Sequence, residues 1–230
     1  GVYVQFCVDV DRSENIELNG NTIGLDVGLK EYYTDSNGVM VENPKFLRKG
    51  EKVLKRSSRR FSRKVKGSKN RGSSRQILGK RHLKISRQRK DHAIKLARCV
   101  VQSNDLIAYE DLRIKNMVKN HCLAKSINDA SWYQFRVWLE YFGKVFERVT
   151  VAVNPAYTSQ ECSSCGAIVK KTLSTRTHVC QCGCVMDRDF NAARNILSRG
   201  LGTVGHTETL ALNASNALGD ESSTFAGEIL

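Results

Sequence analysis

Five of the eight cysteines of this 230-residue chain lie close together in its last third, and no other feature limits the possible folds as strongly. They form a Cys-x-x-Cys turn and a second turn with single residues between the cysteines: Cys162, Cys165, Cys180, Cys182 and Cys184. Tetrahedral zinc prefers thiolate ligands, and two short turns bring four sulfurs together at little cost in loop-closure entropy. Gly166 and Gly183 follow the pairs, where the backbone must turn so that its N–H groups point at the sulfurs. We therefore expect a small module that is stabilised by a structural Zn²⁺ ion.

The spacing leaves alternatives for the fourth zinc ligand. The ligands that we expect are Cys162, Cys165, Cys180 and Cys182. Cys184 competes with Cys182, because a pair of cysteines with three residues between them is also sterically possible. His178 is a weaker candidate. A redox dithiol is a further alternative, but such a motif uses one pair of cysteines and this chain has two.

Acidic residues end two strand-like apolar segments, and a third acid begins a helix directly after the cysteine cluster. Asp26 and Glu110 are the two strand-ending acids, and Asp189 lies two residues after Asp187. Each acid alone is typical of a turn, a helix N-cap or an exposed position, but burial energetics do not explain two acids at the ends of apolar strands. Phosphodiester cleavage with Mg²⁺ needs several hard oxygen ligands around two ions. We interpret Asp26, Glu110 and Asp189 as magnesium ligands and catalytic residues for cleavage of nucleic acid, with Asp187 as the alternative to Asp189.

The positive charge of the chain is confined to one segment. The whole chain has a net charge of +14, yet residues 45–95 contain 21 Lys and Arg against two acids, so the remainder is net negative. The alternative is a solvated helix face, but such a face normally interleaves acids with its lysines. The excess therefore favours a polyanionic partner. We expect nucleic-acid phosphates to contact these side chains: Arg56, Arg59, Arg60, Arg63, Lys64, Lys66, Lys69, Arg71, Arg75, Lys80 and Arg81.

Hydrophobic periodicity predicts a chain that mixes strands and helices. Strands are expected at 2–10, 22–27, 30–35, 39–42, 105–110 and 148–153. Helices are expected at 48–66, 75–103, 130–146 and 191–197, with a Gly- and Ser-rich breaker at 67–74, an end of the last helix at Gly200 and a loosely ordered tail at 201–230. Six aromatic residues at helical spacing are interpreted as core rather than as a base-stacking platform: Trp132, Tyr133, Phe135, Trp138, Tyr141 and Phe142.

The apolar runs, the start of the chain and its isolated cysteines indicate whether it binds a membrane, whether it is part of a longer polypeptide and which redox compartment it occupies. No apolar run approaches the ~20 residues that a membrane-spanning helix needs, so we expect no membrane partner. The chain starts at Gly1 in a strand-like alternation, without an initiator Met or a signal peptide, which is typical of the middle of a longer polypeptide. Cys7, Cys99 and Cys122 lie singly, as core cysteines do in a reducing cytosol.

Several motifs together resemble the TnpB (OrfB) proteins of bacterial insertion sequences. In chain order they are Ile-Gly-Leu-Asp-Val-Gly at 23–28, Tyr-Glu-Asp-Leu at 109–112, Met-Val-Lys-Asn at 117–120, the first cysteine turn within 157–166 and Asp-Arg-Asp-Phe-Asn-Ala-Ala at 187–193. The resemblance implies an α/β fold of the RNase H-like (RuvC) type, a mixed sheet with flanking helices and an inserted zinc ribbon with four cysteine ligands. It implies the catalytic acids Asp26, Glu110 and Asp189, and the same four zinc cysteines. Family members usually have two residues between the cysteines of the second pair, where this chain has one.

The resemblance also implies a function and a division of the chain. Family members are related to the type V CRISPR effectors and act as RNA-guided DNA endonucleases, with a guide RNA from the transposon end, in the prokaryotic cytoplasm and on the nucleoid when bound. By this comparison residues 1–20 end a missing N-terminal region, 21–156 form the nuclease core, 157–186 the zinc ribbon, 187–200 the last nuclease motif and 201–230 a tail. The basic helices of 45–103 would follow the phosphates of an RNA–DNA heteroduplex. A non-catalytic nucleic-acid-binding protein or repressor and a DNA transposase proper are the alternatives, and the sequence does not indicate an oligomeric state.

Overall fold

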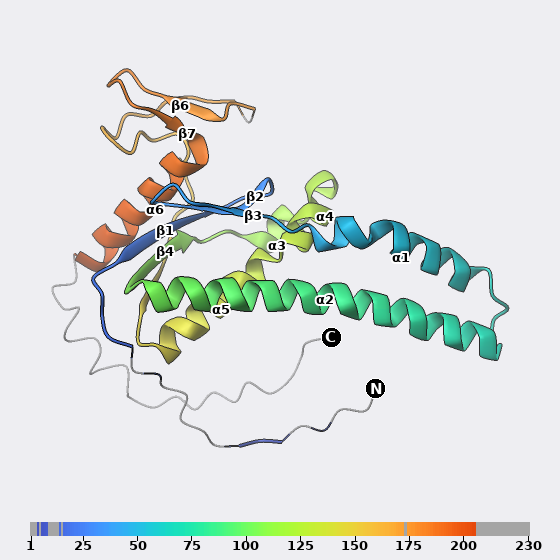
Figure 1. Ribbon diagram of the computed structural model, residues 1–230. Coiled ribbons are helices and arrows are strands. Elements are labelled where there is room, and N and C mark those ends of the chain that lie inside the picture. The colour runs from blue at the N-terminus through green and yellow to red at the C-terminus, as the bar shows by residue number, and fades with distance from the viewer. Residues whose placement is uncertain (1–3, 5, 9–13, 15, 173, 206–230) are drawn as a thin grey trace.

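A five-stranded mixed sheet forms the centre of the fold in a computed structural model that describes residues 4, 6–8, 14, 16–172 and 174–205 (Figure 1). Its strands are β1 (Thr22–Val27), β2 (Glu31–Asp35), β3 (Met40–Glu42), β4 (Leu106–Glu110) and β5 (Val149–Val153), in the order β3-β2-β1-β4-β5. The first three strands are antiparallel neighbours, while β4 and β5 run parallel to β1. The turn between β2 and β3 has Gly38 at φ 87°, a left-handed conformation that favours glycine. The strands expected from the sequence within this sheet are confirmed.

Helices cover both faces of the sheet. Apolar side chains of β1 and β4, including Leu25 and Ile107, pack on α2 (Lys69–Ser103) and α5 (Trp132–Val145). The opposite face carries Ala108 and packs on Ile196 of α6 (Arg188–Gly205). Successive side chains of a strand alternate between these two faces. Every second residue of β1 and β4 therefore faces α6.

The basic segment forms a two-helix arm. α1 (Phe46–Ser62) runs antiparallel to the first half of α2, and this pair projects beyond the sheet (Figure 1). The expected breaker at 67–74 is wrong for residues 69–74, because α2 begins at Lys69. The hydroxyl of Ser68 accepts the N–H of Arg71 as an N-cap, and only Gly67, at φ 83°, stays outside the helix as a turn glycine.

Two short helices, α3 (Ile114–Met117) and α4 (His121–Ala130), connect β4 to α5. The helix expected from 130 instead begins at Trp132, because Ser131 adopts a left-handed conformation at φ 57° and separates α4 from α5. The aromatic residues of α5 are largely core as expected: Phe135 is 2% exposed and Trp132 is 5% exposed, whereas Tyr133 points to solvent.

The cysteine cluster lies beyond the N-terminal end of α6. It contains a two-stranded sheet of β6 (Thr177–Val179) and β7 (Val185–Asp187), and β7 leads directly into α6 (Figure 1). We call residues 157–187 the knuckle. The last helix extends further than expected at both ends, so the predicted helix end at Gly200 and the loose order of 201–205 are wrong.

Two other expectations concern the ends of the chain. The strand expected at 2–10 lies mostly outside the described residues, and the described Val4, Phe6 and Val8 are exposed and not in a strand. The remainder of the expected tail, 206–230, lies outside the described residues. Among the helices that the structure describes, none combines the length and the apolar character needed to cross a bilayer.

Candidate active site and metal centre

Strand alternation places two of the expected catalytic acids on the face of the sheet that packs on α6. Asp26 shares this face with Gly24, and Glu110 shares it with Ala108. Asp189 lies in the first turn of α6. Because β1 and β4 run parallel, both strand-borne acids lie at the same carboxyl-terminal edge of the sheet. Three acids that are far apart in sequence thus meet at one corner of the fold.

The electrostatics of Asp26 reflect this convergence. Burial raises the pKa of Asp26 well above its usual value, and the nearby charges of Glu110 and Asp189 raise it further. Arg188 acts in the opposite direction. Three carboxylates that repel one another in a site largely shielded from water form a hard-oxygen donor set of the kind that binds Mg²⁺. Their ligand atoms do not all lie within 4.8 Å of one another, however, since the described groups that meet this distance are both in the knuckle.

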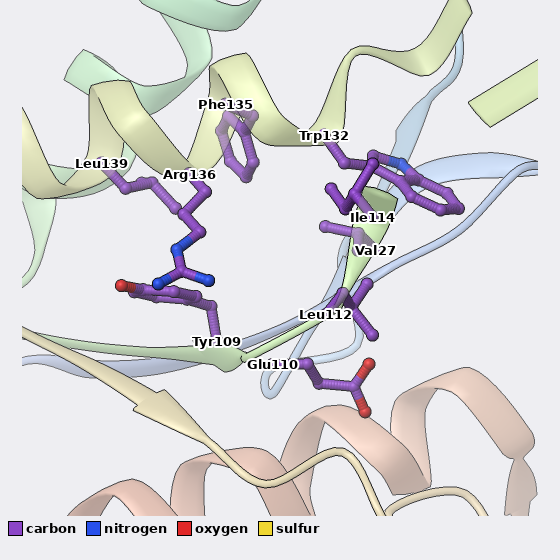
Figure 2. Close-up of a pocket in the computed structure, with 9 residues that line it drawn as sticks. All are labelled: Val27, Tyr109, Glu110, Leu112, Ile114, Trp132, Phe135, Arg136 and Leu139. Atoms are coloured by element: carbon purple, nitrogen blue, oxygen red, sulfur yellow. The ribbon is translucent and has the colours of Figure 1, made fainter. Parts of the chain in front are cut away.

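The carboxylate of Glu110 points toward α6. Figure 2 shows it turned away from a small apolar cavity that is lined on its other side by side chains of α5, including Phe135 and Leu139. The hydroxyl of Thr158 donates a hydrogen bond of 2.7 Å to Glu110 Oε1. Burial raises the pKa of Glu110, while the Thr158 hydrogen bond and the charge of Arg199 lower it and so limit the rise. Neither Thr158 nor Arg199 was expected from the sequence to contribute to the site.

Asp187 and Asp189 have different roles in the structure. Asp187 Oδ1 accepts the backbone N–H groups of Asp189 (2.8 Å) and Phe190 (3.3 Å), as an N-cap side chain does at the start of a helix. Asp189 Oδ1 accepts from Arg188 at 2.9 Å, and Asp189 Oδ2 lies 3.6 Å from a guanidinium nitrogen of Arg176. The capping role of Asp187 favours Asp189 as the catalytic acid of the pair.

Four cysteine sulfurs of the knuckle form a compact group. The Sγ atoms of Cys162 and Cys182 lie 3.7 Å apart, and those of Cys165 and Cys180 lie 3.6 Å apart. A tetrahedral zinc site with Zn–S bonds of ~2.3 Å requires sulfurs ~3.8 Å apart, so these distances fit the ion. All four sulfurs lie within 4.8 Å of one another. The knuckle can therefore hold a metal through the four cysteines that the sequence favoured.

His178 and Cys184 form a second layer around this group. With Cys162 they make another set of ligand atoms within 4.8 Å of one another, but Cys184 does not join the four-sulfur set. Lys171 contacts His178 Nδ1, and the ring of His178 lies beside Cys162. Burial opposes ionisation of Cys162, yet the N–H groups of Ser164 and Cys165 and the side chains of His178 and Cys180 lower its pKa to about 5. His178 thus supports the Cys162 thiolate and is not needed as a ligand.

The basic arm presents most of its cations to solvent. Between α1 and the turn that follows it lies a hollow of about 410 Å³ whose lining residues are all cationic: Arg56, Arg59, Arg60, Arg63 and Lys64. Among the residues that the structure describes, none of these five forms an ion pair within 4.0 Å. Two of the cations that are expected to contact phosphates also hold the arm together. Arg71 lies over the Phe61 ring at 4.4 Å and donates to Lys64 O, and Arg81 donates to Ser57 and to Val53 O.

A further cationic pocket was not expected from the sequence. It lies between the turn after β1, the start of α1 and α4, and it has a volume of about 380 Å³. Four cations line it together with Asp129, whose carboxylate caps the N-terminus of α1: Lys30, Lys45, Arg48 and Lys125. The cationic surface therefore continues from the arm toward the end of β1.

Comparison with known proteins agrees with this architecture. A family model described as "Probable transposase" (OrfB_IS605) matches residues 5–121, and a model of the Cas12f1-like TNB domain matches residues 132–196. The chain belongs to the TnpB (OrfB) family. This membership confirms the resemblance of the sequence motifs, and the mixed sheet with flanking helices confirms the α/β fold class.

Relatives of this TnpB-family chain cover most of its length. A Streptomyces pristinaespiralis protein named "Putative RNA-guided DNA endonuclease" is 39% identical over 78% of the chain and 45% of its own length. The Escherichia coli protein "Putative RNA-guided DNA endonuclease InsQ" is 33% identical over 86% of the chain and 54% of its own length. The chain thus spans about half the length of these curated relatives.

Solved structures share the fold at low sequence identity. A Cas12f1-sgRNA-target DNA complex matches 76% of this chain and 49% of the Cas12f1 chain with a TM-score of 0.50 and 17% identity. A CRISPR-Cas12f ternary complex matches 83% of this chain and 41% of the other chain with a TM-score of 0.52 and 18% identity. At such identities the likeness concerns the fold alone.

Proposed function

We propose that this chain is the nuclease part of a transposon-encoded, Mg²⁺-dependent and RNA-guided DNA endonuclease. The observation that carries the proposal is the convergence of Asp26, Glu110 and Asp189 from two strands and a helix at one corner of the fold. Burial and then the charges of Glu110 and Asp189 raise the pKa of Asp26, so a divalent cation would relieve a repulsion that the fold imposes. The names of two relatives, each a "Putative RNA-guided DNA endonuclease", support the same assignment.

In this proposal the three acids hold the catalytic metal and the remaining residues orient substrate and site. Asp26, Glu110 and Asp189 would bind Mg²⁺, which supplies activation of water and neutralisation of charge on the scissile phosphate. Asp187 fixes the start of α6 and so the direction of Asp189. The knuckle holds structural Zn²⁺ and ties the catalytic helix to the chain segment before it.

The arm would bind nucleic acid by contacting the phosphate backbone of the nucleic acid. The exposed cations of α1 and of the first half of α2 are spaced along one extended surface, which suits contacts to successive phosphates of an RNA–DNA heteroduplex. The partners in this proposal are target DNA and a guide RNA from the transposon end. The nuclease core would comprise 21–156 and 187–200, the Zn²⁺ ribbon 157–186, and further segments of the complete protein would contribute to guide binding.

Metal-dependent DNA cleavage tests the proposal directly. Purified zinc-loaded chain is incubated with single-stranded DNA with and without Mg²⁺, beside Asp26→Ala and, as a matched control, Asp91→Ala on the exposed face of α2. We expect cutting that requires Mg²⁺, is lost in Asp26→Ala and persists in Asp91→Ala.

Three outcomes would contradict the assignment. Binding of DNA without any cutting, also after the region of a full-length relative that this chain does not cover is supplied, would favour a non-catalytic binding protein or repressor. Joining of DNA ends in place of simple hydrolysis would favour a transposase proper. Cutting by Asp189→Ala together with its loss in Asp187→Ala would exchange the roles of these two acids.

A further inference from the structure

Three polar residues of α6 lie on one face of the helix at intervals of four: Asn191, Asn195 and Arg199. This spacing places them one above the other along the helix. Each of them binds the same segment, residues 154–163, which connects β5 to the first zinc cysteines. We call these three residues the α6 stripe.

The hydrogen bonds of the stripe reach the segment along its whole length. Arg199 donates to Asn154 O and Ala156 O, both at 2.8 Å, and pairs with Glu161 at 2.6 Å. Asn195 donates to Thr158 O at 2.8 Å and to Glu161 O at 2.7 Å. Because Asn195 is only 6% exposed and Asn191 is fully buried, the hydrogen bonds of these two asparagines are shielded from water and are costly to break.

The stripe also holds the first zinc ligand in place. Asn191 donates to Glu161 O at 2.7 Å, and its side-chain oxygen accepts the N–H of Ser163 at 3.0 Å. These two bonds bracket Cys162. The backbone at the zinc site is therefore fixed to the helix whose first turn carries Asp189.

The same segment reaches the other side of the active site through Thr158. This residue is 4% exposed, and its hydroxyl lies 2.7 Å from Glu110 Oε1 and 3.2 Å from Pro155 O. A hydroxyl has one proton to donate, and the shorter contact to the charged oxygen is the stronger hydrogen bond. The bond selects one orientation of the Glu110 carboxylate out of those that its flexible side chain could adopt.

From these contacts we infer that Thr158 is a positioning residue for Glu110, and that the α6 stripe couples the zinc-bound knuckle to the catalytic carboxylates through it. The inference rests on the proposed function, since it assigns Thr158 a role in the metal site of that nuclease. The α6 stripe fixes the segment before Cys162, and this segment presents Thr158 to Glu110. A zinc ion bound by the four cysteines would hold Cys162 in place and would contribute to the geometry of the carboxylates only.

Replacing Thr158 tests whether this residue positions Glu110 or only supports the fold. Thr158→Val keeps the shape of the side chain and removes the donor, Thr158→Ser restores the donor, and Thr150→Val makes the same change on the neighbouring strand β5 as a control. For each zinc-loaded protein, binding of Mn²⁺ is measured by electron paramagnetic resonance of the free ion, and the cleavage rate is measured against metal concentration. Zinc content and thermal melting are recorded in parallel.

We expect Thr158→Val to weaken Mn²⁺ binding by about 10- to 100-fold, the usual effect of losing a hydrogen bond to a metal ligand. Cleavage should require a correspondingly higher metal concentration, zinc content should stay at one ion per chain, and Thr158→Ser should recover most of the loss. Mn²⁺ affinity equal to that of the unmodified chain would overturn the inference, and so would loss of zinc in Thr158→Val or an equal effect of Thr150→Val. If the unmodified chain neither binds Mn²⁺ nor cuts DNA, the proposed function itself fails.

Discussion

At the scale of single residues, the buried carboxylate of Asp26 serves the proposed chemistry but lowers the stability of the folded chain. Burial first, and then the charges of Glu110 and Asp189, raise the pKa of Asp26 above its value in the unfolded chain. A group of this kind stabilises the fold fully below its unfolded pKa and loses this contribution as the pH rises through the folded pKa. Ionisation of Asp26 therefore costs more free energy in the folded chain than in the unfolded chain.

Asp26→Asn is expected to stabilise the zinc-loaded, magnesium-free chain at pH 7 by about 1 kcal/mol, or ~2–4 °C in Tm. The amide is neutral at every pH, so the gain should fall toward zero as the pH is lowered to about 4, near the unfolded pKa of Asp. Thermal melting by circular dichroism between pH 4 and 8 measures the difference. Asp91→Asn, which lies on an exposed face of α2, is the control and should alter Tm little. A gain of the same size at pH 4 and pH 7 would rule out an electrostatic origin.

Local sequence signals predict some residues of the site and leave others unpredicted. The acids stand out because each ends an apolar strand or follows the cysteine cluster, and the cysteines stand out by their spacing. Thr158 has no such signal, because its partner Glu110 lies 48 positions away and only the folded chain brings them together. Arg71 and Arg81 look like every other cation of the basic segment, and their structural roles depend on Phe61 and Ser57 in the facing helix.

At the scale of elements, the closeness of α6 to the sheet positions Asp189. A Cβ atom added at Gly24 would meet the backbone oxygen of Ala193 and lie 2.7 Å from the backbone nitrogen of Leu197. A Cβ atom added at Gly200 would lie 2.5 Å from Ala108 Cβ. Backbone atoms cannot move aside as a side chain does. α6 therefore packs this closely on the sheet only because Gly24 and Gly200 carry no side chain.

We expect Gly24→Ala to destabilise the chain by about 1–3 kcal/mol and to reduce Mn²⁺ binding, because α6 must move outward and take Asp189 with it. Gly202→Ala is the matched control in the same helix, where no described atom lies within 4 Å of an added Cβ. It should stabilise the helix by about 0.5–1 kcal/mol, since alanine replaces glycine in a helix interior. Chemical denaturation and Mn²⁺ titration of both variants measure the effects. Unchanged stability of Gly24→Ala would mean that α6 is not held as closely as the structure shows.

The basic arm should determine how nucleic-acid binding depends on salt. Replacing Arg56, Arg60 and Arg63 by Gln keeps helix propensity and removes three cations from the hollow of the arm. The slope of log K against log salt concentration should become shallower by about 1 for each residue that contacts a phosphate of a duplex. Fluorescence anisotropy with labelled duplex at several salt concentrations measures the slope. Lys95→Gln, near the other end of α2, should leave it unchanged, and an unchanged slope in the triple variant would remove the arm from the interface.

Most elements follow from the sequence, and the errors have local causes. The strands of the central sheet are short apolar runs next to turn residues, so their existence is readily predicted. The sequence predicts too late a start for α2, because Ser68 and Gly72 look like loop residues, although Ser68 is the N-cap and Gly72 lies inside the helix. The split between α4 and α5 depends on the left-handed Ser131, which no pattern indicates. In α6, Gly200 looks like a helix end, but it is the residue that lets the helix approach Ala108.

At the scale of the whole molecule, the apolar clusters and the four-cysteine group lie in different parts of the described chain. The three apolar clusters of the described chain involve the sheet, α2, α3, α4, α5 and α6, and none includes a residue of the knuckle. The knuckle instead contains the four-cysteine group that could hold a metal, and the α6 stripe binds its first residues. Small modules without an apolar core commonly depend on the free energy of metal binding for their fold.

Removal of zinc should therefore unfold the knuckle and leave the core intact. With a zinc-selective chelator, far-ultraviolet circular dichroism should keep most of its helical signal, because α2 and α5 pack on the sheet without contact to the metal. Trypsin should then cut faster at the exposed Lys170 and Arg176, which mass spectrometry can map, and Mn²⁺ affinity should fall because the segment that carries Thr158 is released. Re-addition of Zn²⁺ should reverse both changes. Loss of the whole helical signal in a single transition on chelation would show that the core needs the knuckle in order to fold. Unchanged Mn²⁺ affinity would show that the two metal sites are independent.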